Sequence, residues 1–281
     1  MNTPKFPVVI SVLNHKGGVG KTTTTANLGA GLARSGLKVL LIDLDVQANL
    51  THQLIVDLPE GQENICEVLL EERPLDRIIA ETGTPGLFIA PAGESLIELD
   101  LNLFQKFGRE YVLKNSIEQT TGISSFDVVL IDNPPYISLA TVNSLTASDF
   151  YLVPVSCEYL PMLGIKYLQK TVARLQKVNP KLKPLGVAMT MYDKRESIAQ
   201  SVAELVREEL ADQVFDWIVI DKDLIHSAMM SKGSSTLDTT PAAYEIALSL
   251  LEDLIVKQFH AYLLRIESIR ILFRCFVGRM G

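Results

Sequence analysis

Eight consecutive residues near the start of the chain, 16–23, combine the residue types that bind phosphate. They read Lys-Gly-Gly-Val-Gly-Lys-Thr-Thr, and they follow the apolar run Val8–Leu13 and precede an amphipathic segment. Glycines let backbone N–H groups approach phosphate oxygens closely, and a helix start adds unpaired amides and a favourable dipole. A lysine and a hydroxyl ending such a loop predict contacts with the β- and γ-phosphates and with Mg²⁺. The predicted nucleotide-binding residues are Lys16, Gly17, Gly18, Val19, Gly20, Lys21, Thr22 and Thr23.

A carboxylate that could serve the same site follows a second apolar run. Val128–Ile131 is uninterrupted by polar residues and is followed at once by Asp132. Open α/β sheets bind ligands at the carboxyl ends of their strands. An aspartate there can hold Mg²⁺ through a water molecule, because this small ion keeps much of its hydration. We therefore predict that Thr22 and Asp132 belong to one metal site.

The elements that must position these residues are visible as an alternation of short β-branched runs and longer helical patterns. Several runs are apolar throughout, as in strands of a parallel sheet covered on both faces. The prediction is an α/β fold with a doubly wound, mostly parallel sheet and helices on both faces. Strands are expected at Val8–Leu13, Lys38–Ile42, Leu87–Ala90, Asp127–Ile131, Phe150–Val155, Pro184–Thr190 and Val214–Ile220. Helices are expected at Thr23–Ser35, Leu96–Glu118, Met162–Lys177 and Ser197–Leu210, with a short one near Ile65–Glu72 inside a surface excursion.

Lys16 is one lysine more than an ordinary phosphate loop contains. With it, the loop matches KGGxGK[ST] and resembles the deviant Walker A P-loop ATPases of the ParA/Soj/MinD family. Residues 43–51 resemble that family's DxDPQxN motif, with Val46 where proline is usual, and the Asp-Asn-Pro-Pro that begins at Asp132 resembles its Walker B ending. The segments 157–164 and 186–193 are similar to those of the ParA/Soj partition type. The resemblance covers about residues 6–256.

The resemblance implies a Mg²⁺-dependent ATP hydrolase that is slow and stimulated by a partner. It implies ATP and Mg²⁺ as cofactors and a homodimer in the ATP state, in which Lys16 reaches the phosphates of the partner's nucleotide. Lys16 would then act as an arginine finger does, and hydrolysis would depend on dimerisation. Of the carboxylates in the second motif, Asp45 is the one expected to position the attacking water, and Asp43 is expected to support the metal shell.

Relatives of this type act in chromosome or plasmid partitioning or in intracellular positioning, and their known partners differ. The resemblance implies non-specific DNA binding, a ParB-like activator protein and a cytoplasmic, nucleoid-associated location. Candidate DNA contacts are Lys194, Arg195 and Lys222, and the patch could extend to Arg174, Lys177 and Lys232. Against this reading, Asp221 and Asp223 flank Lys222 where the family usually has IPRN. A net charge of −7 also argues against a globally basic nucleic-acid binder.

The C-terminal segment suggests the alternative, a MinD-like protein bound peripherally to membrane. Residues 257–281 carry five basic residues and one acidic residue, and helical spacing places apolar side chains on much of the remaining surface. Such a basic amphipathic helix can lie in a lipid interface, but it can equally pack on the protein body, a second subunit or a cargo. The predicted division is an ATPase domain at 1–256 and this tail at 257–281.

Other classes of protein fit the sequence less well. No signal peptide or membrane-spanning run is expected, and the three cysteines (Cys66, Cys157 and Cys275) are expected to be reduced structural thiols. An electron donor resembling nitrogenase iron protein would need paired cysteines at a dimer axis. A module that binds ATP without hydrolysing it stays open, and an assay of phosphate release distinguishes it.

Overall fold

The computed structural model describes residues 6–54, 62–157, 162–193, 195–210 and 214–220. Some predicted features lie outside the described residues. They are the candidate DNA contacts Lys194, Lys222 and Lys232 and the C-terminal segment 257–281, which includes Cys275.

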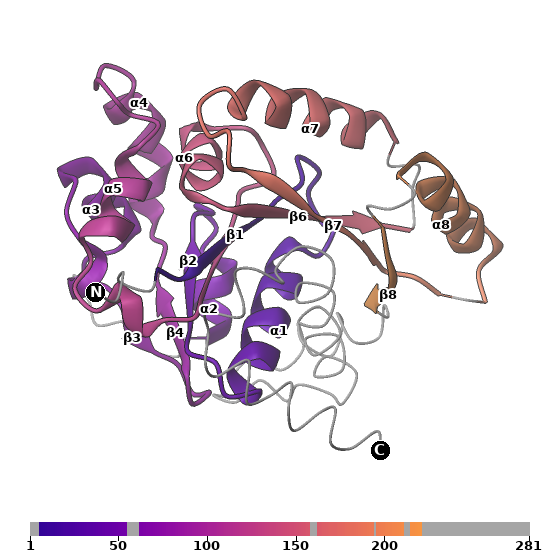
Figure 1. Ribbon diagram of the computed structural model, residues 1–281, viewed down its shortest axis with the longest axis horizontal. Helices are drawn as coiled ribbons and strands as arrows, with labels where there is room; N and C mark the ends of the chain where they lie inside the picture. Colours follow the sequence, from indigo (N-terminus) through magenta and orange to yellow (C-terminus); the bar gives the residue numbers. More distant parts are fainter. Residues whose placement is uncertain (1–5, 55–61, 158–161, 194, 211–213, 221–281) are drawn as a thin grey trace.

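Eight strands form one sheet in the order β3-β4-β2-β5-β1-β6-β7-β8 (Figure 1). Every neighbouring pair is parallel except β3 with β4, so the predicted doubly wound, mostly parallel sheet is confirmed. Because β5 lies between β1 and β2, the carboxyl ends of these three strands meet at one edge. The strands are β1 (Val8–Val12), β2 (Val39–Asp43), β3 (Ala80–Glu81), β4 (Leu87–Ala90), β5 (Val128–Asp132), β6 (Phe150–Ser156), β7 (Lys183–Thr190) and β8 (Val214–Ile220).

Helices cover both faces of the sheet (Figure 1). The helices α1 and α2 pack on one face, and α3 to α8 pack on the other. Successive residues of β1 divide between the faces, since Val8 and Ile10 join the first core cluster and Val9 joins the second. The helices are α1 (Lys21–Arg34), α2 (Asn49–Leu54), α3 (Ile65–Glu71), α4 (Leu99–Leu103), α5 (Val112–Gln119), α6 (Leu139–Ala147), α7 (Met162–Leu175) and α8 (Ser197–Leu210), with short 3₁₀ turns η1 (Leu75–Arg77), η2 (Glu94–Glu98) and η3 (Ile123–Ser125).

The prediction of one continuous helix over Leu96–Glu118 is wrong. The segment is divided into η2, α4 and α5, with a turn between α4 and α5 that contains Gly108 at φ 68°. Backbone in that left-handed region cannot continue an α-helix, and glycine adopts it at little cost. Among the described residues, no helix is long and apolar enough to cross a membrane.

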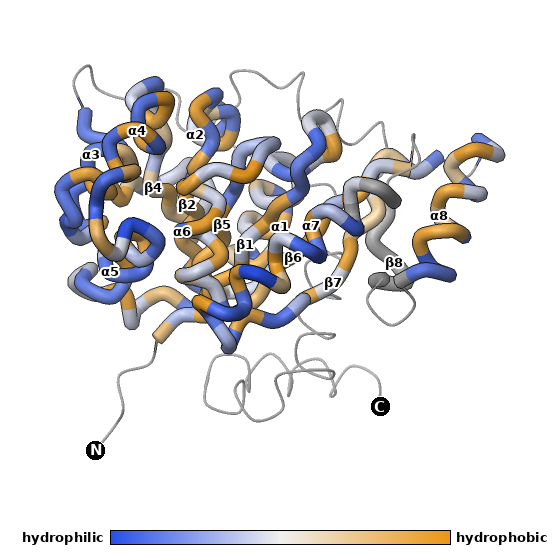
Figure 2. Tube along the Cα trace, turned by 90° about the horizontal axis from the view of Figure 1, so that it is seen from above, coloured by the Kyte–Doolittle hydropathy of each residue, from blue (hydrophilic) through white to orange (hydrophobic). Residues whose placement is uncertain are grey.

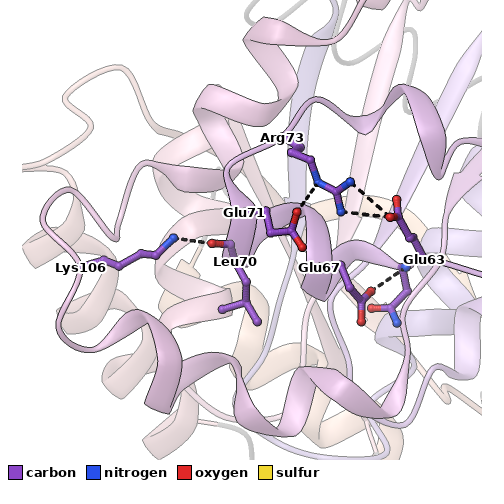
Figure 3. A network of polar contacts seen from close by, with 7 residues as sticks. Glu63, Glu67, Leu70, Glu71, Arg73 and Lys106 are labelled. Atoms are coloured by element: carbon purple, nitrogen blue, oxygen red, sulfur yellow. Dashed lines mark hydrogen bonds and ion pairs between the residues drawn. The ribbon is translucent and has the colours of Figure 1, made fainter.

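The predicted short helix of the surface excursion is α3, which is held by a polar network (Figure 3). Its N-terminus is closed by a capping box between Asn64 and Glu67. After its C-terminus, Arg73 forms ion pairs with Glu63 (3.2 Å) and Glu71 (3.0 Å). These contacts hold both ends of a short helix whose propensity alone would not keep it formed.

Candidate functional site

The phosphate loop turns because two of its glycines adopt left-handed backbone conformations that other residues rarely adopt. Gly18 has φ 70° and Gly20 has φ 82°, and Gly20 is the N-cap of α1. A side chain at either position would be strained by its backbone conformation. The loop therefore leads from the carboxyl end of β1 directly into the N-terminus of α1, where unpaired amides and the helix dipole favour an anion.

The two lysines of the loop have different environments. Lys21 is buried, and its Nζ donates a hydrogen bond of 3.0 Å to the carbonyl oxygen of Lys16. Burial lowers the pKa of Lys21, while the carboxylates of Asp132 and Asp45 oppose that effect. The side chain of Lys16 is exposed on the loop surface. Lys21 is thus held inside its own site, whereas Lys16 faces outward.

The predicted metal-site residues Thr22 and Asp132 are in direct contact. Thr22 Oγ1 donates to Asp132 Oδ2 over 2.7 Å, and Asp132 is the last residue of β5 and fully buried. Burial raises the pKa of the Asp132 carboxyl and the nearby Asp43 raises it further, whereas Thr22 and Lys21 lower it. A buried carboxylate beside a second carboxylate is an environment that favours a cation.

Asp43 and Asp45 have different surroundings. Asp43 is opposite Asp132 in the sheet register, and its oxygens accept from the amides of Asp45 (3.1 Å) and Thr51 (2.9 Å) and from the Thr51 hydroxyl (2.8 Å). Burial raises the pKa of Asp43 in spite of these donors. Asp45 Oδ1 accepts from the amide of Gln47 (3.0 Å), and no other hydrogen bond to its carboxylate is formed by the described residues. The carboxylate of Asp43 is therefore fixed by three hydrogen bonds within the protein, whereas that of Asp45 keeps an oxygen available to a ligand.

Two residues that support the loop are not evident from the sequence. Asn14 donates to the carbonyl of Pro154 (2.7 Å) and accepts from the amide of Lys16 (3.1 Å). Thr190, the last residue of β7, donates to the carbonyl of Val19 (2.8 Å) from a fully buried position. The sequence signals for Thr190 are its place at the end of an apolar strand and within the family-like segment 186–193, and neither predicts a contact with the loop. These bonds fix the loop to β6 and β7 as well as to β1.

His15 joins the loop to α7. Its Cε1 lies 2.5 Å from where a Cβ on Gly164 would be, and its ring centroid is 5.4 Å from that of Tyr167. The Nδ1 atom of His15 is buried and has no hydrogen-bond partner among the described residues. Only a glycine at position 164 leaves room for this ring. His15, the residue before Lys16, can therefore pack against the first turn of α7.

The residues present fit a magnesium nucleotide. Among the described residues, no group of three or more His, Cys, Asp or Glu side chains forms a metal cage. Mg²⁺ does not need one, because it is commonly held by one or two protein oxygens together with water and substrate phosphates. Thr22 and Asp132 supply such oxygens, and Lys21 is close enough to Asp132 for their charges to interact. The donor set is therefore that of a metal–phosphate site and not of a closed metal centre.

The predicted DNA contact Arg195 is paired with a neighbouring carboxylate. Its Nη2 and Nε lie 2.6 Å and 2.9 Å from oxygens of Asp193. The guanidinium of this bidentate ion pair is exposed, so solvent screens the pair and its energetic contribution is small. A phosphate group would nevertheless have to compete with Asp193 for this guanidinium.

The two described cysteines, Cys66 and Cys157, are buried and form no disulfide. They lie in different core clusters, Cys66 with α3 and Cys157 with β6. Burial raises the pKa of both thiols, that of Cys157 to about 11. Neither of these two thiols is exposed at the surface, where a cysteine-held cluster at a dimer axis would need it.

These features define a P-loop nucleotide-binding protein. They are a strand, a glycine loop and a helix, together with Lys21, Thr22 and the aspartate at the end of β5. A family model for an AAA domain matches residues 8–184. The chain is 36% identical over 253 residues to the chromosome partitioning protein ParA of Caulobacter vibrioides, covering 89% of this chain and 94% of that protein. It is 37% identical over 212 residues to the sporulation initiation inhibitor protein Soj of Bacillus subtilis, covering 75% and 83%. The chain belongs to the ParA/Soj family of P-loop ATPases.

Solved structures agree on the fold and on the nucleotide. A crystal structure of cobyrinic acid a,c-diamide synthase from Mycobacterium smegmatis, with bound ATP analog and magnesium, superposes with a TM-score of 0.77. It is 34% identical, and the match covers 90% of this chain and 97% of that one. A form of the same enzyme with ADP and magnesium gives the same TM-score. The related proteins thus carry names for partitioning and for amide synthesis, and the structures named for amide synthesis hold a magnesium nucleotide in this fold.

Proposed function

We propose that this chain is a ParA-type ATPase that uses Mg·ATP to switch between a monomer and a dimer during partitioning or intracellular positioning. The observation that carries the proposal is the meeting of Lys21, Thr22 and Asp132 at the carboxyl ends of β1 and β5. The relatives named for chromosome partitioning and for sporulation control, 36% and 37% identical to this chain, support partitioning as the process. The ATPase domain would span 1–256.

Each residue has a role in this proposal. The loop amides and Lys21 bind phosphate oxygens, and Thr22 and Asp132 hold the metal ion, directly or through water. Asp43 orients the turn that carries Asp45 through its bonds to Asp45 and Thr51. Mg²⁺, when bound, neutralises charge that develops on the phosphates.

Asp45 is proposed to orient the attacking water through its carboxylate. One oxygen is fixed by the amide of Gln47, so the group has a defined direction while the other oxygen is available. Lys16 is proposed to act on the nucleotide of a second subunit. Its exposure and the burial of Lys21 support that division of roles, since two lysines directed at one phosphate from one chain would repel each other.

Binding of the ATP dimer to non-specific DNA and stimulation by a ParB-like partner belong to the same proposal. Arg195 is the described residue among the predicted DNA contacts. If the dimer binds DNA in this way, the protein is located in the cytoplasm at the nucleoid. The alternative, membrane binding through 257–281, concerns residues outside the described part of the chain and predicts binding to anionic vesicles that is lost when 258–281 are deleted.

Light scattering of the full chain with ATP and Mg²⁺ tests the switch. Lys16→Ala should abolish ATP-dependent dimerisation while nucleotide binding persists, and turnover should fall by about 10³-fold or more. Lys21→Ala is the matched control, because it should abolish nucleotide binding itself. If Lys16→Ala dimerises with ATP as the unaltered protein does, Lys16 does not act on the nucleotide of a second subunit. Absence of phosphate release from the unaltered protein, even with DNA, would instead indicate a nucleotide-locked module.

A further inference from the structure

A cluster of exposed apolar side chains lies on η2, α4 and the turn that follows α4. Its members are Ile97 (74% exposed), Leu101 (80%), Phe104 (65%) and Phe107 (fully exposed). We call these four residues the α4 patch. Apolar surface in water is unfavourable, and where such side chains gather they commonly mark an interaction site.

Helical spacing places most of the α4 patch on one face. Ile97, Leu101 and Phe104 are separated by four and three residues, which brings them to the same side of the helical turns. The other side of the segment is used by the core, since Leu99 and Leu103 are buried in the second cluster. Figure 1 shows α4 at the outer edge of the group of helices that includes α3 and α5, and Figure 2 shows hydrophobic residues along it. The α4 patch therefore faces outward.

The charges around the α4 patch are acidic. Residues 92–105 include three acidic residues and no basic one. The three are Glu94, Glu98 and Asp100, and all are exposed. No ion pair to any of them is formed within the described part of the chain. The patch thus combines apolar side chains with negative charge that is not neutralised there.

The nearest basic residues are engaged by the protein itself. Lys106 donates to the carbonyl of Leu70 (Figure 3) and forms an ion pair of 3.1 Å with Glu72. Arg109 donates to the carbonyl of Phe104, and its guanidinium lies 5.2 Å from the centroid of the Phe104 ring. Neither basic residue forms an ion pair with the acidic residues around the patch.

An occupant of the α4 patch must be both apolar and basic. Duplex DNA and anionic lipid are repelled by the three carboxylates. A second copy of the patch, meeting it about a two-fold axis, would bring like carboxylates together. A basic amphipathic segment satisfies both the apolar side chains and the charge.

This chain contains a segment of that composition in its tail, 257–281, which lies outside the described residues. The tail has five basic residues and one acidic residue, a charge of +4 in a chain of net charge −7. Its apolar residues recur at helical spacing, as in Leu263, Ile266, Ile269, Phe273 and Phe276. We propose that residues 257–281 dock on the α4 patch of the same subunit.

The length of the chain allows this contact. The sheet order places β8 at one edge and β4, which precedes η2, next to the other. Eight strands at about 4.8 Å spacing extend over about 34 Å. Residues 221–256 separate β8 from the tail, and an extended chain of that length reaches about 120 Å.

The α4 patch adjoins the proposed nucleotide site. Asp100 accepts a hydrogen bond of 3.0 Å from the amide of Leu139, the first residue of α6. Burial raises the pKa of Tyr136, and the negative charges of Asp45 and Asp100 raise it further. A tail docked on the patch therefore lies beside the segment that follows Asp132. The docking itself does not depend on the proposed function.

Photo-cross-linking in the full chain tests the contact. Phe104 is replaced by photoreactive p-benzoylphenylalanine, and the peptides joined after irradiation are identified by mass spectrometry. We expect links from position 104 to peptides within 257–281. The matched control carries the same amino acid in place of Ile198, an exposed apolar residue of α8, and should give no such link. In a mixture of ¹⁵N-labelled and unlabelled protein, the two linked peptides should carry the same label, because they come from one subunit.

Trypsin digestion of the full chain gives a second measurement, since the basic residues of the tail are its cleavage sites. Leu101→Glu with Phe104→Glu should speed cleavage within 257–281 by about 10-fold, because proteolysis follows the population of the open form. Val178→Glu with Ile198→Glu adds the same charge at exposed apolar positions and should be cleaved as the unaltered protein is. The cross-link decides the matter if the α4 variant fails to fold.

The proposal is overturned if position 104 forms no link to 257–281, or if the two double variants are cleaved at equal rates. Links between peptides of different label would place the tail of one subunit on another and contradict docking within a subunit. Links from position 104 to residues 92–107 of a second copy would instead assign the α4 patch to self-association.

Discussion

The hydroxyl of Thr22 donates a hydrogen bond of 2.7 Å to Asp132, joining the start of α1 to the end of β5 across 110 residues of sequence. Both groups are oxygen ligands of the kind Mg²⁺ prefers, and neither segment alone would make a metal site. The contact shows that the fold already brings the phosphate loop and the carboxylate proposed to bind metal together.

Removing the Thr22 hydroxyl should therefore impair metal use more than folding. We expect Thr22→Ala to lower ATP turnover at saturating magnesium by about 10²-fold, because an interaction with the transferring group's charge is lost. Phosphate release measured against magnesium concentration checks this. Thr22→Ser keeps the hydroxyl and should retain most activity; equal loss in the serine variant would show that the hydroxyl is not what matters.

Asp45→Ala should leave ATP binding intact and stop hydrolysis, so that the ATP dimer accumulates. The reason is that Asp45 has one oxygen held by Gln47 and one available, as a group that orients water requires. Light scattering and phosphate release on the same sample measure the two effects. Normal turnover in this variant would refute the assignment.

Asp43→Ala should act mainly on stability. Its carboxylate is the acceptor for two backbone amides and the Thr51 hydroxyl, which would be left buried without partners. We expect the free energy of unfolding to fall by on the order of 3 kcal/mol, measured by urea denaturation. Asp45→Ala, which removes one such bond, is the comparison and should lose clearly less; equal losses would contradict a structural role for Asp43.

Gly164→Ala should displace His15 and loosen the loop, because the new methyl group would lie 2.5 Å from His15 Cε1. The expected result is weaker nucleotide binding, by about 10-fold, in a titration with a fluorescent ATP analogue. Adding His15→Ala to this variant frees the space and should restore part of the affinity. If the double variant binds no better than Gly164→Ala alone, the two residues are not coupled.

Cys157 should be inert to alkylation in the folded protein at neutral pH. Burial raises the pKa of its thiol to about 11, so at pH 8 about one molecule in a thousand carries the reactive thiolate. Its reactivity should rise as the pH approaches the raised pKa. Mass spectrometry after iodoacetamide treatment resolves Cys157 from the other cysteines, and unfolding in urea gives the fully reactive control. Rapid native labelling at pH 8 would contradict burial.

Seven of the eight strands agree with the sequence-based expectation to within one residue at each end. The apolar runs of β1, β2 and β5 are buried throughout, and continuous hydrophobicity is a strong local signal. The short antiparallel β3 was not expected, because two residues, Ala80 and Glu81, are too few to form a pattern. The broken helix between η2 and α5 was missed since its apolar spacing continues through Gly108, whose conformation is set by the turn.

The sequence by itself determined the phosphate loop, because Lys16 to Thr23 are contiguous and their chemistry follows from residue type and backbone freedom. It also determined the parallel α/β fold, because unbroken apolar strands are the pattern that burial on both faces of a sheet requires. The sequence also predicted that Thr22 and Asp132 share one site, and the structure supplies their direct hydrogen bond. Only the tertiary structure decided which other distant groups support the loop. Thr190 donates a hydrogen bond to Val19, and His15 packs against Gly164, because separate elements come together there.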